Sequence, residues 1–258
     1  MKQIQTYIIS GIIVIIAFTG LSFSESTRLS MLCSEIEINI DNNTDSNNFV
    51  RHQDVLQLIQ PYTDSIKSRK ISSISLHDIE KTILNHPSVE NCNVYVTVHG
   101  KMSIDITQRS PLIRVESKHD SFYIDKKGRL MPLSKSYTSH SIIASGNINA
   151  GYREKFNILV PNQDTDTTLR NLYTIAQFVN ANELLESIIE QIHITDGDEY
   201  ILISKIGPTY IHIGSPENLA YKLRNLEAFY HSKKARELWN TYRTINLKYK
   251  NQIICTKK

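Results

Sequence analysis

The sequence predicts an α+β protein with a single N-terminal transmembrane helix, a first domain ordered β-α-α-β-β, and a mixed β-rich second domain with helices. Three observations predict this class: an uncharged apolar segment near the start, a change from helical to strand periodicity between residues 75 and 115, and short strands and turns after residue 112. The 258 residues exceed one typical domain. We therefore expect a cytoplasmic tail at 1–3, a transmembrane anchor at 4–24, a first domain at 34–110 and a second at 111–255.

The anchor is predicted from the absence of charge. No charged side chain lies between Lys2 and Glu25, and these 22 residues would span about 33 Å as a helix, against roughly 30 Å for a bilayer core. A cleaved signal peptide is the alternative, but Ser22-Phe23-Ser24 is a poor cleavage site. We expect an uncleaved anchor that keeps the short tail in the cytoplasm and exports everything after residue 25.

The first domain opens with a strand and a helix. Ile36, Ile38 and Ile40 alternate with polar residues, which predicts a strand with one wet face. Residues 52–60 then carry apolar side chains at helical spacing, and we expect this helix to stop at Pro61.

A second helix and a hairpin complete that domain. Ser75, followed three residues later by Asp78, is a capping-box pattern that opens a helix, and Pro87 stops it. Residues 94–98 and 102–106 then alternate apolar and polar residues on either side of Gly100, which predicts two paired strands joined by a tight turn.

The second domain is predicted as short strands with two helices. Residues 169–179 have the spacing of an amphipathic helix, and Ser215-Pro216-Glu217 is expected to open another in N-cap, N1 and N2 order. The expected strands lie at 112–115, 122–125, 130–133, 188–194, 200–204, 210–213, 245–249 and 253–255.

Composition and motifs argue against several classes of function. A net charge of +3 with scattered basic residues does not suggest a nucleic-acid surface. The three cysteines are too far apart for a disulfide framework or zinc site, and no nucleophile, paired-carboxylate or phosphate-cradling motif is present. We expect a protein that is not an enzyme, with no catalytic residues, no metal, no cofactor and no small-molecule substrate.

His193 and His212 allow one alternative. Both lie in predicted strands between isoleucines, so their rings could meet across paired strands and hold a metal ion. Half-exposed strand histidines are the interpretation that we favour, because no ligand spacing supports a metal site.

Several stretches of the sequence resemble a known family. His86-Pro87-Ser88-Val89, the hairpin after it and Gln108 to Ile113 resemble the POTRA domain of the cell-division protein FtsQ/DivIB family. POTRA domains also occur in outer-membrane transport proteins. The stretch Tyr123-Ile124-Asp125 with Gly128 resembles the "(Y/V)D-x-x-G" text that follows the POTRA domain in the division family, and Ile245-Asn246-Leu247-Lys248-Tyr249 resembles its C-terminal "(I/V)DLRY".

The resemblance implies a bitopic divisome scaffold in the bacterial inner membrane, with its C-terminal domains in the periplasm at the division site. Such a protein binds other single-pass division proteins, FtsB/FtsL-like coiled-coil proteins, and regulates septal wall synthesis. By match to the family, an edge strand near the C-terminus binds the partner, through Tyr249, Asn251, Ile253 and Ile254. The alternative is a POTRA-bearing component of an export or outer-membrane transport system.

Overall fold

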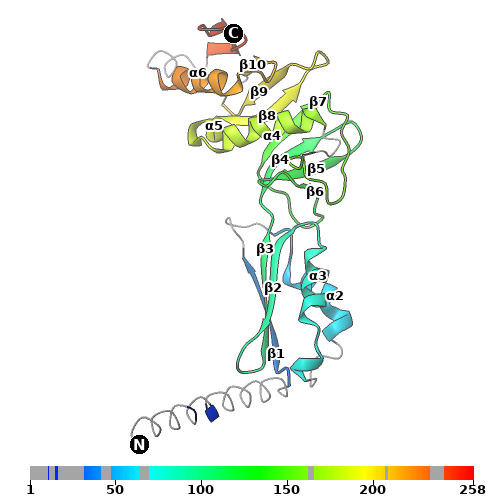
Figure 1. The fold of residues 1–258 in the computed structure, drawn as a ribbon. Coiled ribbons are helices and arrows are strands. Elements are labelled where there is room, and N and C mark those ends of the chain that lie inside the picture. The colour runs from blue at the N-terminus through cyan, green and yellow to red at the C-terminus, as the bar shows by residue number, and fades with distance from the viewer. Residues whose placement is uncertain are drawn as a thin grey trace, which may run out of the picture. The chain divides into compact units, whose positions relative to one another are not determined.

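The computed structural model describes residues 11, 15–16, 32–41, 48–63, 70–161, 166–206, 209–232 and 241–258 (Figure 1). The predicted tail at 1–3 and, apart from Gly11, Ile15 and Ile16, the predicted anchor at 4–24 lie outside the described residues. Within the described part of the chain, no helix is both long and apolar enough to cross a membrane. The chain divides into two compact units, Met1–Gln108 and Arg109–Lys258.

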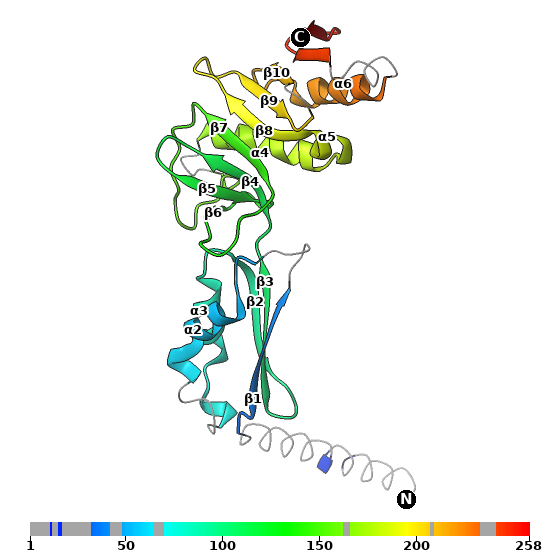
Figure 2. The same ribbon diagram turned by 180° about the vertical axis from the view of Figure 1, so that it is seen from behind.

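The first unit has the predicted β-α-α-β-β order. Its elements are β1 (Glu35–Asp41), α2 (His52–Thr63), a 3₁₀ turn (Ile71–Ser73), α3 (Leu76–Leu84), β2 (Val89–Val96) and β3 (Lys101–Gln108). The sheet order is β1-β3-β2, with β1 parallel and β2 antiparallel to β3. Helices α2 and α3 lie together beside this sheet (Figures 1 and 2).

The core of this unit follows the two periods of the sequence. Ile79 and Ile83, one turn apart on α3, are completely buried. They pack in one cluster with Met102, Ile104 and Ile106, the alternate residues of β3 that face the helices. The Ser75 hydroxyl accepts a hydrogen bond from the Asp78 amide at 3.4 Å, as the capping pattern predicts.

Helix α2 corrects one expectation. It continues through Pro61 to Thr63 instead of stopping at residue 60. Pro61 lies in the last turn, so it removes one hydrogen bond to the preceding turn and only two helical residues follow it. Tyr62 then packs against the core, and its hydroxyl lies 2.9 Å from the Thr82 hydroxyl on α3. This contact stabilises the additional residues of α2.

The loop after α3 makes the first unit sensitive to acid. Burial lowers the pKa of His86 below its ordinary value of 6.5, and the Asp54 carboxylate opposes this shift in part. The Ser88 amide donates to Nδ1 of His86 at 3.3 Å, which requires an unprotonated Nδ1. The unfolded chain therefore binds a proton more readily at His86 than the folded chain does, and stability is lost as pH falls through 6.5 and below.

We expect the urea concentration at the unfolding midpoint of the first unit to decrease when the pH is lowered from about 7.5 to 5.5. Amide exchange in this unit measures that midpoint. Comparison with His86→Gln isolates this contribution, because glutamine does not titrate and its side-chain oxygen is an acceptor for the Ser88 amide. A midpoint that shifts equally with pH in the two proteins would contradict the assignment to His86.

The second unit is built on a nine-stranded mixed sheet ordered β12-β11-β10-β9-β8-β7-β4-β5-β6. Its strands are β4 (Pro111–Glu116), β5 (Ser121–Asp125), β6 (Leu130–Pro132), β7 (Ile142–Gly146), β8 (Ile189–Ile194), β9 (Tyr200–Ser204), β10 (Tyr210–Gly214), β11 (Tyr242–Asn246) and β12 (Ile254–Lys257). Its helices are α4 (Thr167–Asn180), α5 (Glu183–Ile188) and α6 (Leu219–His231). This is the mixed, β-rich fold with helices that the sequence predicts.

One core runs along the whole sheet. The apolar stripe of α4, including Leu172 and Ala176, is completely buried and belongs to the same cluster as Val115 on β4, Ile192 on β8 and Leu223 on α6. Strand residues on the other face of the sheet, such as Gln191 and His193 on β8, are only partly buried. The helices therefore cover one face of the sheet.

The β5–β6 hairpin is held by a buried carboxylate. Asp125 is 1% exposed, and its Oδ1 accepts hydrogen bonds from the amides of Lys127 at 2.8 Å and Arg129 at 2.7 Å. Its Oδ2 accepts from Nη1 of the buried Arg109 at 2.9 Å. Gly128, at φ +77°, supplies the left-handed position of the turn. The Asp and Gly of the hairpin motif thus have structural roles.

Candidate partner-binding edge

Strand β12 ends the sheet of the second unit. Within the described residues its strand neighbour is β11, with Asn246 opposite Ile254 and Tyr242 opposite Lys257. The backbone amide of Lys258 donates to the Thr241 carbonyl at 2.9 Å, so this amide points toward the side of the strand where β11 lies. Because the amides of an antiparallel strand alternate in direction, those of residues 253, 255 and 257 point toward the free side.

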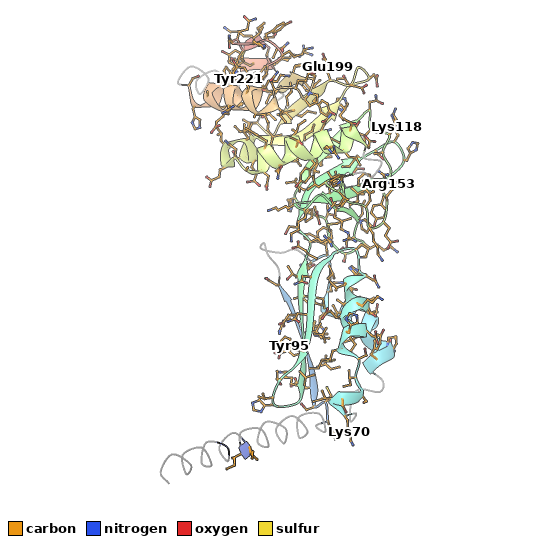
Figure 3. All side chains as sticks on the ribbon, viewed as in Figure 1. Lys70, Tyr95, Lys118, Arg153, Glu199 and Tyr221 are labelled. Atoms are coloured by element: carbon orange, nitrogen blue, oxygen red, sulfur yellow. The ribbon has the colours of Figure 1, made fainter. Side chains whose placement is uncertain are left out.

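The turn that leads into β12 is held by α6. Asn251 has a left-handed backbone, at φ 59°. Its side-chain oxygen accepts a hydrogen bond from the Tyr221 hydroxyl at 2.8 Å, and its amide donates to the same hydroxyl at 3.3 Å. Tyr221, labelled in Figure 3, lies in the first turn of α6 and is partly exposed. One tyrosine thus fixes the turn that precedes the edge strand.

Two lysines beside this turn are held by different partners. Nζ of Lys222 donates to the carbonyls of Ile213 at 2.9 Å and Ser215 at 2.8 Å. Burial lowers the pKa of this ammonium, the Glu217 carboxylate raises it, and the nearby Lys248 ammonium lowers it. Lys248 itself forms an ion pair with Glu199 at 2.7 Å; Glu199 is labelled in Figure 3.

A cavity of about 500 Å³ lies between the start of α6 and the turn before β12. It is lined by Ser215, Glu217, Asn218, Tyr221, Lys222, Leu247, Lys248, Tyr249, Lys250 and Asn251. The charged residues of this lining are three lysines and one glutamate, and one of the lysines, Lys248, pairs with Glu199, so a net positive charge remains beside the cavity. A free strand edge and a basic cavity therefore lie next to each other.

Comparison with known proteins agrees with this architecture. A family model described as FtsQ/DivIB, C-terminal related, matches residues 110–256, which is more than half of the chain. The chain belongs to the FtsQ/DivIB family. A second model, described as a POTRA-like domain, matches residues 31–107. No curated protein matches the chain. Both family expectations for the fold, a POTRA-like domain followed by a β-rich one, are thereby confirmed.

The four site residues predicted for this FtsQ/DivIB protein fall into two pairs. Tyr249 and Asn251 line the cavity, and Tyr249 is 51% exposed and lies in the turn, not in a strand as the spacing predicted. Ile254 is the first residue of β12 and is 44% exposed. Ile253 directly precedes β12 and packs partly against the core. The structure brings the first pair to the cavity and the second pair to the edge.

The alternative of a metal site between the two strand histidines is not supported by the register. His193 on β8 and His212 on β10 both lie opposite Ile201, which belongs to the intervening strand β9. The two histidines therefore lie on strands that do not pair with each other, about 10 Å apart, and not across one strand pair as that alternative supposes. His193 instead places its Nδ1 3.1 Å from the Ser145 hydroxyl.

Sequence reasoning missed the contribution of α6 to this candidate site. The helix begins at Leu219, not at Ser215-Pro216-Glu217, because Asn218 at φ 54° interrupts the helical dihedral angles. This break places Ser215 where its carbonyl binds Lys222. Tyr221 and Asn251 are 30 residues apart, so only the fold reveals their contact, and no local pattern in the sequence signals it.

Proposed function

We propose that this FtsQ/DivIB-family protein is a bitopic scaffold of the bacterial division machinery, anchored in the inner membrane with both domains in the periplasm. It binds other single-pass division proteins, of the FtsB/FtsL-like coiled-coil type, and thereby regulates septal wall synthesis. The contact is strand addition at β12, with Tyr249, Asn251, Ile253 and Ile254 meeting the partner. Membership of a family of non-catalytic division scaffolds supports the general role.

The free edge of β12 carries the proposal. An added strand would receive main-chain hydrogen bonds from alternate residues of β12, which provide affinity, while side chains provide selectivity. Ile254 offers an exposed apolar contact on the edge itself, and Tyr249 offers an exposed aromatic ring beside it. Aromatic side chains are enriched at protein interfaces, in keeping with a contact here.

Charge supports a partner segment that carries acidic residues. Residues 205–258 contain eleven Lys or Arg and three Glu. Lys222, Lys248 and Lys250 line the cavity beside the edge. An acidic segment would be attracted to this end of the domain and would associate faster at low salt.

Affinity capture of the tagged full-length protein from its own membranes in mild detergent tests the proposal. Recovery of small single-pass coiled-coil division proteins supports it. Recovery of an outer-membrane barrel or a transport machinery would instead favour the alternative, a POTRA-bearing export component, and would contradict the division role.

Proline at Ile253 tests the edge. Ile253→Pro removes an amide that points to the free side, so we expect at least a tenfold loss of partner capture, about 1.4 kcal/mol. Ile253→Ala is the matched control, since it shortens the side chain and keeps the amide. Circular dichroism of both variants checks the fold. Full capture by a folded Ile253→Pro protein would rule out strand addition at this edge.

A further inference from the structure

The two sheets present four terminal strands, and these differ in how they are protected against pairing. Exposed edges are commonly blunted by shortness, bulges, lysine or proline. Strand β6 has three residues and ends in Pro132. Strand β12, which we propose above as a partner-binding edge, has four residues and includes Lys257, so its protection is only partial. Strand β2 has a register irregularity between Val89 and Asn91.

Strand β1 has none of these devices. It is seven residues long, Glu-Ile-Glu-Ile-Asn-Ile-Asp, without lysine, proline or glycine. It pairs with β3 in unbroken register from Glu35 opposite Lys101 to Asp41 opposite Thr107. Among the described residues β3 is its one strand neighbour, so β1 forms an edge of the sheet.

The apolar face of β1 is incompletely covered. On β3, Met102, Ile104 and Ile106 are at most 1% exposed. Their neighbours on β1 in the same rows, Ile36, Ile38 and Ile40, are only partly buried. At the other edge of this sheet, Val94 and Val96 of β2 are buried. Burying the remaining exposed area of the β1 isoleucines would favour an additional strand here.

The opposite face of β1 is acidic. Glu35, Glu37 and Asp41 are exposed on it. From the β3 side, Nζ of Lys101 lies 3.3 Å from Glu35 and 3.0 Å from Glu37. A strand added on the free side would bring its own side chains to the same carboxylates from the other direction, and opposite charges on adjacent strands stabilise the pairing.

We propose that β1 is a second strand-addition site, and that its partner is an extended segment of another protein in which lysine or arginine alternates with aliphatic residues. The aliphatic residues extend the row of Ile36, Ile38 and Ile40, and the basic residues pair with Glu35, Glu37 and Asp41. A second copy of β1 does not fit, because antiparallel self-pairing centred on Ile38 places Glu35 opposite Asp41, and like charges opposite each other are destabilising.

The test uses the full-length protein in detergent and a labelled, end-blocked probe peptide, Lys-Ile-Lys-Val-Lys-Ile-Thr. We expect fluorescence anisotropy to show saturable binding that weakens with salt. Glu35→Lys with Glu37→Lys should reduce the affinity at least tenfold. Glu154→Lys, an exposed charge reversal in the second unit, is the matched control and should bind like the unchanged protein.

Two further probes test whether the main chain mediates binding. Two versions of the same peptide are made, one N-methylated on its odd-numbered amides and one on its even-numbered amides. In an added strand only one of these two sets of amides points toward β1, so one methylated peptide should lose binding and the other should keep it. Amide exchange should show new protection at residues 35–41. Equal binding of both methylated peptides, affinity unchanged in the double variant, or protection confined to residues 253–257 would overturn the proposal.

Discussion

Asp125→Asn is expected to lower the free energy of unfolding of the second unit by about 3–5 kcal/mol, the cost of leaving one member of a buried ion pair without its partner. The substitution preserves volume, so packing is nearly unchanged. It leaves the guanidinium of Arg109, itself 8% exposed, without a carboxylate in the interior. Among the described residues, Nε of Arg109 has no hydrogen-bond partner, which makes the loss of the bond at Nη1 more costly.

Denaturant unfolding of the full-length protein measures this effect, with amide exchange at residues 121–132 as the readout. The same chemical change at the exposed Asp196 is the matched control and should alter stability by less than about 0.5 kcal/mol. A loss below about 1 kcal/mol in Asp125→Asn would contradict the role of the ion pair in holding the hairpin.

The second large effect is expected for Gly146→Ala, at the end of β7. Gly146 has φ +100° and lies opposite Ile194 in the parallel β7–β8 pair. A methyl group there would come within 2.0 Å of the Ile194 carbonyl oxygen and 2.9 Å of the His193 ring. Since the clash is with backbone, the strands must separate, and we expect a loss of about 3 kcal/mol from strain and overpacking together.

Gly197→Ala provides the matched control for this prediction. Gly197 has its nearest foreign atom 3.9 Å from the position of an added methyl group, so alanine there meets only ordinary contact. Thermal unfolding of the two variants should therefore differ by several degrees, with Gly146→Ala lower. Equal melting temperatures would show that the β7–β8 pairing is not as tight as the structure indicates.

Elements with local signals were predictable from the sequence. The Ser75–Asp78 cap and the buried pair Ile79 and Ile83 mark α3 within a few residues of chain. The alternating isoleucines of β1 do the same for an edge strand. In each case the interactions that define the element lie within one helical turn or between alternate strand residues. The hydrophobic period and the capping residue are therefore enough to predict the element.

The candidate site was only partly predictable because its contacts join distant segments. Lys248 and Glu199 are 49 residues apart, and Tyr221 reaches Asn251 from a helix whose start the sequence misplaced. The position of β9 between the two strand histidines likewise follows from tertiary pairing. No local pattern encodes such distances, although the exposed edge near the C-terminus was expected from the family resemblance.

The strand order of the second unit has a consequence for biosynthesis. From β7 to β12 each strand pairs with the one made just before it, so this half of the sheet can be assembled as the chain emerges. Among the described strands of this unit, β12 is synthesised last. Prematurely terminated chains would therefore fold most of the domain and still lack the edge strand that we propose as the partner-binding site. Under the proposed function, only chains that include β12 would bind the partner.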